Sequence, residues 1–275
     1  MEDKPKNLIK YKLRNLLFNY LRKKDYIINN YSGDTNLRNF FNSIKPVDIE
    51  EGLIRIGGNN DGGYLIPNIL EGIEYCFSPG VAENASFEKE LSENYNIKSF
   101  MCDLSVNNLP IEDSSFKFLK KNLNVYSNEE NITFEDWFMS SIDENIGEAI
   151  LQMDIEGYEY KVLYDIPQKI LSNFRILVVE FHDFSRFLFE PIGYHFVSGL
   201  FEKLLSQFSV VHIHENNCCP STTMKNIRIP KVVEMTFLNK NYVNSTGKEA
   251  SIPHPLDEKN VPELPDSYFP KLWNI

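Results

Sequence analysis

Short apolar runs alternate along most of the chain with segments whose apolar residues recur at helical spacing. Strands separated by helices of about ten residues indicate βαβ units and a mainly parallel sheet. The predicted strands are 53–56, 64–66, 75–78, 97–102, 149–155, 175–181, 208–213 and 232–238. The predicted helices are 37–43, 84–95, 133–141, 159–171 and 193–207. The pattern therefore predicts an α/β fold with a Rossmann-like sheet.

Local signals add detail to this pattern. No helix separates the last two predicted strands, 208–213 and 232–238, which predicts an antiparallel edge on the sheet. The run 59–63, Asn-Asn-Asp-Gly-Gly, is typical of a hairpin turn. Thr133, with Asp136 three positions later, predicts a capped helix start. Residues 251–273 hold five prolines, so they are expected to form an irregular strap over the surface.

The N-terminal segment differs from the rest. Residues 6–24 predict an amphipathic helix rich in lysine and arginine, followed by a linker, so we expect a division into residues 1–48 and a domain over 49–275. The favoured role of this helix is packing on the domain or on a second copy in a homo-oligomer. Contact with an anionic membrane surface is a possible but less favoured role.

Composition and charge limit the function classes. The chain has 275 residues, 42% of them hydrophobic, which is enough for a large core. Residues 1–30 carry eight basic and three acidic residues, a net charge of +5, so the total of −11 leaves −16 on the rest. An acidic body argues against binding a nucleic-acid backbone.

The cysteines and the apolar runs predict a cytoplasmic protein. The four cysteines have neither zinc-site nor disulfide-framework spacing, which favours a reducing compartment. We expect no signal peptide and no membrane span, since no apolar run approaches about 20 residues.

A first candidate site follows the strand 75–78. Gly80 stands between that strand and a helix, where a ligand can approach the backbone, and Asp103 ends the next strand, placed for ribose hydroxyls. A nucleoside cofactor is one interpretation, and an ordinary glycine turn with a surface aspartate is the other. The single glycine argues against a pyrophosphate cofactor such as NAD and suits S-adenosylmethionine better.

A second candidate site lies at two further strand ends. Asp154 and Glu156 follow one strand, and Glu180 and His182 end the next. In a parallel sheet these groups would meet in one crevice, where they could bind a hydroxyl substrate, remove its proton or hold a divalent metal ion. Helix caps and loop salt bridges are the alternative.

Two weaker groups follow. His212 and His214 share one face of a strand, but a metal role for both is disfavoured, and His214 with Asn217 is expected to line a pocket. His254 lies in the proline-rich strap, and the segment 254–257 is either a loop over the substrate or, slightly favoured, a surface strap.

Together these motifs resemble the FkbM-type family of class I S-adenosylmethionine-dependent methyltransferases. The resemblance spans about residues 53–240, and the run 154–159, Asp-Ile-Glu-Gly-Tyr-Glu, is its most specific part. The other matching pieces are Gly57, the run 61–64, Ser78, Gly80, the run 86–88, Asp103, the run 180–182, His214, Asn216 and Asn217. The resemblance implies a seven-stranded, mainly parallel class I sheet with an N-terminal helical extension.

The resemblance also implies roles for single residues. Asp103 would hold the ribose of the cofactor, and Asp154 and Glu156 would lie beside the sulfonium and the acceptor. The cofactor's methionine part would lie against Ser78, Gly80, Val81, Glu83 and Asn84. The substrate would contact Tyr158, Glu180, His214, Asn217 and His254. The run 79–82, Pro-Gly-Val-Ala, departs from the family pattern, since it lacks the Gly-x-Gly of many class I enzymes.

The resemblance further implies methyl transfer to a hydroxyl of a sugar, as a nucleotide-activated sugar or a polysaccharide precursor. Such a hydroxyl needs a base or a metal ion beside it. His182 is the first candidate base because it titrates nearest neutrality, with Asp154 or Glu156 as alternatives. A metal ion would be held by Asp154, Glu180 and His182. The competing hypotheses are an NAD-dependent sugar oxidoreductase or epimerase and a non-catalytic scaffold on the same fold.

Overall fold

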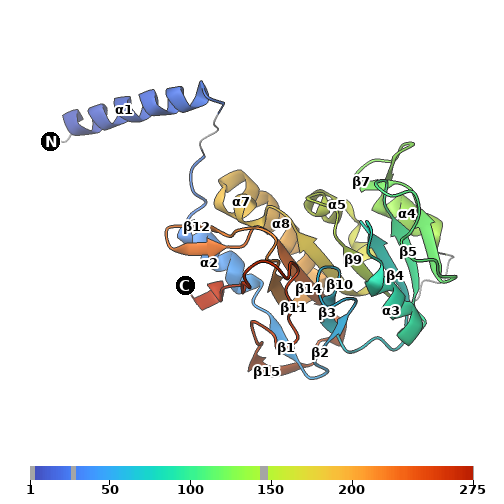
Figure 1. Ribbon diagram of the computed structural model, residues 1–275. Coiled ribbons are helices and arrows are strands. Elements are labelled where there is room, and N and C mark those ends of the chain that lie inside the picture. Colours follow the sequence, from blue (N-terminus) through green and yellow to red (C-terminus); the bar gives the residue numbers. More distant parts are fainter. Residues whose placement is uncertain (1–3, 26–28, 143–147, 275) are drawn as a thin grey trace.

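A seven-stranded sheet forms the centre of the molecule (Figure 1). The computed structural model describes residues 4–25, 29–142 and 148–274. The strand order is β11-β14-β10-β9-β4-β5-β6. The bounds are Ile73–Pro79 for β4, Lys98–Cys102 for β5, Phe116–Leu119 for β6, Glu148–Met153 for β9, Phe174–Phe181 for β10, Phe208–Glu215 for β11 and Val233–Asn239 for β14.

The sheet topology confirms the predicted fold class. Strands β6, β5, β4, β9 and β10 are parallel, and β14 runs antiparallel between β10 and β11. The antiparallel pair lies at one edge, as expected, with β11 outermost. From β4 the chain moves outward to β5 and β6, whereas β9 starts the other half, so the strand order reverses between β4 and β9. The carboxyl ends of these two strands therefore bound a crevice, the usual ligand site of such sheets.

Each face of the sheet is covered differently. On one face, Phe77 and Leu151 pack into a large core with helices including α4 and α8. On the other face, Cys76 and Ile150 pack with α3 and the β2–β3 hairpin. The helices are α2 Asp34–Ser43, α3 Ser86–Tyr95, α4 Phe134–Ser141, α5 Glu159–Asp165, α6 Gln168–Leu171, α7 Phe184–Phe189 and α8 Pro191–Gln207. Because both faces are covered, the central strand β10 is buried along its whole length.

Several local expectations are confirmed and one is wrong. The hairpin joins β2, Leu53–Ile56, to β3, Tyr64–Pro67, and the backbone N–H of Asp136 donates to Thr133 Oγ1 over 3.1 Å. The single helix predicted over 159–171 is two helices, α5 and α6. Pro167 lacks a backbone N–H and forces an extended Ile166, at φ −55° and ψ 123°, so the helix ends before it.

Besides the predicted β2–β3 hairpin, further short strands lie outside the main sheet, and these were not predicted. They pair as β1 with β15, β7 with β8 and β12 with β13. Their bounds are Val47–Ile49 for β1, Asn122–Asn124 for β7, Asn131–Thr133 for β8, Thr222–Met224 for β12, Ile227–Ile229 for β13 and Ser245–Glu249 for β15. The 3-10 turns η1, Lys240–Tyr242, and η2, Leu272–Asn274, complete the elements of the described residues.

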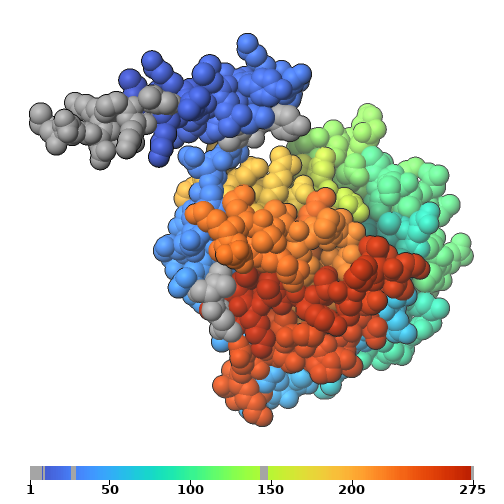
Figure 2. All heavy atoms as spheres, turned by 60° about the vertical axis from the view of Figure 1, so that its left-hand side comes forward, coloured from blue at the N-terminus to red at the C-terminus, as the bar shows by residue number. Residues whose placement is uncertain are grey.

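The two chain ends behave differently. Helix α1, Lys4–Arg22, projects from the body, and its Leu13 and Leu16 side chains are more than half exposed (Figure 2). Helix α2 instead packs into the main core, and the division of the chain at residue 48 stays a prediction. The strap over 251–271 contains no regular element and spreads over one face, where it is red in Figure 2. Within the described residues, no helix is both long and apolar enough to cross a bilayer.

Candidate active site

A cavity of about 470 Å³ lies at the carboxyl ends of β4, β5 and β9. Its lining residues are Asp61, Gly80, Ala82, Cys102, Asp103, Ser105, Asn122, Leu123, Asp154, Ile155, Glu156 and Tyr158. The first two candidate sites of the sequence thus open into one cavity. Its position at the reversal of strand order is the position that this fold class uses for ligands.

Gly80 lets the two halves of the cavity approach each other. Its φ is +85°, and a Cβ built on it would lie 1.6 Å from the carbonyl oxygen of Asp154. Its backbone N–H donates to Cys102 O over 3.0 Å. Only glycine fits here, because the end of β9 takes the place of a side chain. The backbone therefore brings Asp154 next to the turn that was predicted to hold a cofactor.

Asp103 is held at the end of β5 by three hydrogen bonds. Its Oδ1 accepts from the backbone N–H and the hydroxyl of Ser105, both over 2.7 Å, and its Oδ2 accepts from the Ala82 N–H over 2.9 Å. Oδ1 therefore already accepts two hydrogen bonds, whereas Oδ2 accepts one and keeps a free acceptor direction. The side chain lines the cavity, so it presents a fixed hydrogen-bond acceptor there, and its contact with ribose hydroxyls stays a prediction.

The other predicted cofactor residues lie at different distances from this cavity. Ser78 is fully buried and does not line the large cavity; its hydroxyl lies within hydrogen-bond distance of Glu88 Oε1 and Gln152 Oε1, and both of these residues line a smaller adjoining cavity. Val81 and Asn84 also line this smaller cavity, of about 80 Å³, and Glu83 is exposed and lines neither cavity.

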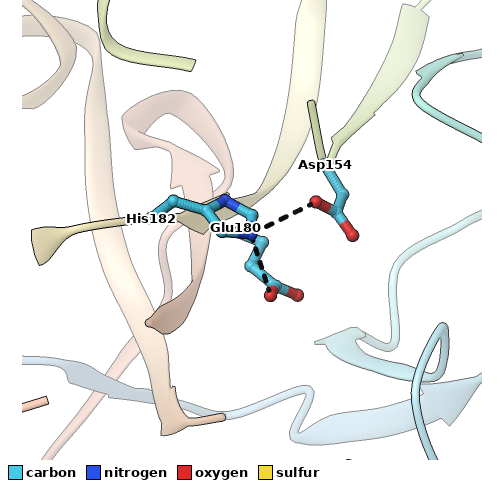
Figure 3. Close-up of side chains that lie close together, drawn as sticks. All are labelled: Asp154, Glu180 and His182. Atoms are coloured by element: carbon cyan, nitrogen blue, oxygen red, sulfur yellow. Dashed lines mark ion pairs between the residues drawn. The ribbon is translucent and has the colours of Figure 1, made fainter. Parts of the chain in front are cut away.

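Four side chains, which we call the acid–histidine group, meet at the ends of β9 and β10: Asp154, Glu156, Glu180 and His182. His182 Nε2 lies 3.4 Å from Glu156 Oε2, 3.7 Å from Glu180 Oε1 and 3.9 Å from Asp154 Oδ1. Figure 3 shows Asp154, Glu180 and His182 pointing toward one another. The predicted meeting of these groups from two neighbouring strands is thus observed in the structure.

Glu159 fixes the orientation of His182. Its Oε1 lies 3.0 Å from His182 Nδ1 and also accepts the backbone N–H groups of Ile155 and Gly157 over 3.1 and 3.0 Å. Glu159 is fully buried at the start of α5. The positive φ of Glu156 and Gly157, +56° and +96°, turns the chain so that these donors converge on Glu159. The imidazole therefore directs Nε2 at the three other carboxylates.

Burial and crowding shift the pKa values of the group. Burial raises the pKa of Asp154 to about 7, although His182 opposes the shift. Burial also raises the pKa of Glu180 well above its usual range, and the nearby Asp154 and Glu234 carboxylates add to this effect. Burial alone would lower the pKa of His182, but Glu159, Asp154 and Glu156 outweigh it and raise that pKa. Such perturbed groups in a cavity are typical of functional sites.

The predicted substrate residues on β11 and in the strap lie elsewhere. His214 Nε2 lies 3.2 Å from Asn260 Oδ1, and its Nδ1 lies 3.6 Å from Asp257 Oδ1. His212 Nε2 lies 3.0 Å from the same Asp257 oxygen. We call His212, His214, Asp257 and Asn260 the strap clasp, because the first two are on β11 and the last two are in the strap.

Asn217 and His254 serve the same attachment. The Asn217 amide donates to the carbonyl oxygens of Val261 and Pro265 over 2.9 and 3.2 Å. The His254 ring lies 6.1 Å from the His212 ring, in an edge-on arrangement. Asn217, His214 and His254 therefore hold the strap, the slightly favoured interpretation of 254–257. Tyr158 and Glu180 lie at the cavity and in the acid–histidine group, respectively.

Sequence reasoning missed two polar residues beside the site. Asp61, in the hairpin turn, lines both cavities. Asn260 donates to Asp61 Oδ1 over 3.1 Å and to Glu234 Oε1 over 2.5 Å, so it links the strap to the cavity wall. The run 61–64, Asp-Gly-Gly-Tyr, was identified as part of a turn and of the family resemblance, but no role was predicted for Asp61, and no local signal marked Asn260.

Residues 29–210 match the methyltransferase FkbM domain family. The chain belongs to the FkbM methyltransferase family. The resemblance predicted from the motifs is thereby confirmed. No curated protein matches the chain. Solved structures similar to this methyltransferase include precorrin-6y C5,15-methyltransferase from Geobacter metallireducens GS-15, which is 8% identical, with a TM-score of 0.32 and coverage of 62% of this chain and 84% of that one.

Proposed function

We propose that this methyltransferase uses S-adenosylmethionine and transfers the methyl group to a hydroxyl of a sugar. The observation that carries the proposal is the cavity that joins Gly80 and Asp103 to the acid–histidine group. Its volume of about 470 Å³ is within the usual range of small-molecule sites. Gly80 lets the ends of β4 and β9 lie close together at the cavity wall, and Asp103 Oδ2 offers an acceptor for a ribose hydroxyl. The adenine base of the cofactor would find hydrogen bonds and apolar contact at Ser105, Asn122 and Leu123.

The charge of the cavity favours this cofactor over a nucleotide with phosphates. Asp61, Asp103, Asp154 and Glu156 bring four carboxylates to its lining, and none of them pairs with a lysine or arginine within the described ranges. Such a lining attracts a positive sulfonium and repels a pyrophosphate. The NAD-dependent alternative is disfavoured for this reason, as it was by the single glycine.

The acidic lining also limits which acceptors fit the cavity. A sugar ring presents hydroxyls that the carboxylates can accept, and Tyr158, 45% exposed at the cavity, offers an aromatic face to the ring. If the acceptor is a nucleotide-activated sugar, its phosphates lie outside this acidic cavity. A neutral sugar end of a polysaccharide precursor fits without that restriction. A cytoplasmic location stays a prediction.

The reaction asks two things of the protein: alignment of the acceptor oxygen and removal of its proton. S-adenosylmethionine supplies a methyl group on a positive sulfur, and the new C–O bond forms as the C–S bond breaks. Asp154 lies at the cavity wall, where it orients the acceptor hydroxyl. Glu156 takes the proton, because its side chain is 87% exposed, lines the cavity and ends 3.4 Å from His182. We therefore assign the base role to Glu156 in place of His182, whose Nε2 faces three carboxylates.

Calorimetric binding of S-adenosylhomocysteine tests the cofactor assignment. The wild-type protein is expected to bind it, and Asp103→Ala is expected to weaken binding at least about tenfold through loss of the ribose contact. Asp113→Ala is the matched control. Asp113 forms the same turn with Ser115 as Asp103 does with Ser105, but it does not line the cavity. Absence of binding by the wild type, or equal effects of the two substitutions, would refute the assignment.

Methyl transfer itself separates the enzyme from the scaffold hypothesis. Transfer of labelled methyl from S-adenosylmethionine to a panel of neutral glycosides and nucleotide sugars is the direct measurement. Wild-type protein that binds the cofactor but methylates no acceptor in the panel would support the scaffold hypothesis.

A further inference from the structure

We infer that Asp154, Glu180 and His182 bind a divalent transition-metal ion, of the class of Mn²⁺, next to the acceptor hydroxyl. Each residue can offer one ligand atom, and these three atoms lie within 4.8 Å of one another. Two carboxylates and an imidazole are a donor set that transition ions accept more readily than Mg²⁺ does.

The spacing of the three ligand atoms fits a shared ion better than direct contact. His182 Nε2 is 3.7 Å from Glu180 Oε1 and 3.9 Å from Asp154 Oδ1, too far for a hydrogen bond. Ligands about 2.1 Å from one ion lie roughly 3 to 3.5 Å from each other. These two spacings exceed that range by less than about 1 Å, and the Asp154 and Glu180 oxygens lie within 4.8 Å of each other, so side-chain movements of about 1 Å suffice to place all three atoms on one ion (Figure 3).

Unpartnered oxygen atoms point to a missing cation. Glu180 has a side chain only 5% exposed; its Oε1 accepts from the Asn216 amide over 3.0 Å, and its Oε2 has no hydrogen-bond partner. Asp154 Oδ1 is likewise buried and without one. Neither carboxylate pairs with a lysine or arginine in the parts of the chain that the structure describes. Buried carboxylates without partners are costly, and a bound ion removes that cost.

The support behind His182 is typical of a metal ligand. A ligating histidine usually gives its second ring nitrogen to a carboxylate, which fixes the tautomer and the ring orientation. Here the fully buried Glu159 lies 3.0 Å from Nδ1 and leaves Nε2 for the ion.

The ion would act on the proposed reaction, and its role rests on that proposal. A bound cation polarises the acceptor hydroxyl, which makes an ordinary carboxylate a sufficient base. Glu156 is outside the ligand set and stays free to take the proton. In this proposal three buried or half-buried side chains bind the ion, and one exposed side chain accepts the proton.

A second trio of carboxylates, Asp61, Glu180 and Glu234, lies close enough to compete for the ion. Two of its members already accept hydrogen bonds from the Asn260 amide. Both bonds would have to break for Asp61 and Glu234 to face a cation. In the trio that contains His182, the one such bond runs from the Asn216 amide to Glu180 Oε1, and Glu180 Oε2 and Asp154 Oδ1 have no partner, so we place the ion on that trio.

Electron paramagnetic resonance of Mn²⁺ titrated into the full chain tests the site without substrate or cofactor. One Mn²⁺ per chain is expected, with an imidazole nitrogen coupling that His182→Gln removes. Asp154→Asn and Glu180→Gln are each expected to weaken Mn²⁺ binding about tenfold or more, and either suffices should the other fail to fold. Asp183→Asn is the matched control, since this carboxylate follows the same strand but faces Lys231 and Arg186.

Several results would overturn the site: no Mn²⁺ binding, an unchanged affinity in Glu180→Gln, or loss of binding in Asp61→Asn but not in Asp154→Asn. Binding of S-adenosylhomocysteine in the presence of a chelator is measured in parallel. If that binding and methyl transfer persist while Mn²⁺ does not bind, the metal site fails and the proposed function stands. If Mn²⁺ binds but S-adenosylhomocysteine does not, the metal site stands and the proposed function fails.

Discussion

Two groups of histidine and carboxylate side chains lie near the same end of the sheet and differ in what surrounds them. In the strap clasp, Asp257 is buried between His212 and His214, and Asn260 joins His214 to Glu234. In the acid–histidine group, three carboxylates face one imidazole, and oxygens of Asp154 and Glu180 lack hydrogen-bond partners. Similar residue types thus form a closed structural contact in one place and an open group beside a cavity in the other.

The pKa shifts follow from this difference. Burial would raise the pKa of Asp257, but the two histidines outweigh burial and hold it well below its usual range. Burial raises the pKa of Asp154 to about 7, and the single His182 only partly opposes it. A carboxylate with enough cationic partners contributes to stability, whereas one without them is available for ligands and chemistry.

The comparison is tested most strongly by the paired substitutions His182→Gln and His214→Gln. The first is expected to reduce methyl transfer about 10²–10³-fold with little change in melting temperature, since it removes a ligand of the ion proposed to polarise the acceptor hydroxyl. The second is expected to lower stability by about 1–3 kcal/mol through a lost buried hydrogen bond, with turnover of the folded fraction nearly unchanged. Turnover and thermal unfolding of both variants are the measurements. Equal losses of turnover would show that the two groups do not divide the roles as described.

The sequence predicted the open group better than the closed one. Asp154, Glu156, Glu180 and His182 end consecutive parallel strands, and the topology of such sheets brings those ends together. His214, Asn217 and His254 had the same residue chemistry, but their partners are in an irregular strap. Because the strap has no periodicity, nothing in the sequence indicated that Asp257 and Asn260 fold back onto β11.

The fold shows the same limit. Strongly apolar segments such as β9 and β10 were predicted within a few residues, because burial on both faces demands continuous apolar runs. The edge strand β6 was missed, since its alternation over Phe116–Leu119 is short and follows a polar loop. Pro167 signalled the break between α5 and α6, but the apolar periodicity across it favoured a single helix.

The open group also depends on a tight backbone, which Gly80→Ala tests. Both the positive φ and the overlap with Asp154 O oppose the new Cβ, so we expect a loss of about 3–4 kcal/mol. Gly157→Ala is the control with a similar φ of +96° and nothing within 4 Å of the added Cβ, and it should cost only about 1–2 kcal/mol. Denaturant unfolding measures both. A smaller loss for Gly80→Ala than for Gly157→Ala would mean that the close approach of β4 and β9 is not required.

The closed group predicts a stability change at alkaline pH. Burial would lower the pKa of His214, but Asp257 and Glu234 outweigh it and raise that pKa to about 9, above its ordinary 6.5. Protonated His214 therefore stabilises the fold fully below pH 6.5, and this contribution, at most about 3 kcal/mol, is lost as the pH rises through 9. Unfolding free energies from pH 6 to 10 measure this contribution. The neighbouring titratable groups are His212, His254, Asp257 and Glu234. Asp257→Asn should flatten this pH dependence, and an unchanged slope in that variant would separate His214 from the clasp.

Asn260 connects the two groups, so Asn260→Leu tests whether they act separately, and its expected effect is the smallest of those predicted here. The substitution keeps the volume but removes the bonds to Asp61, Glu234 and His214, and a loss of about 1–2 kcal/mol of stability is expected. Because Asp61 lines the cavity, the KM for the acceptor should rise a few-fold while kcat changes little. Asn241→Leu, on an exposed 3-10 turn remote from the strap, controls for the loss of an amide. A fall in kcat with an unchanged KM would instead show that Asn260 acts on the reaction itself, and the strap clasp and the acid–histidine group would then not be separate in function.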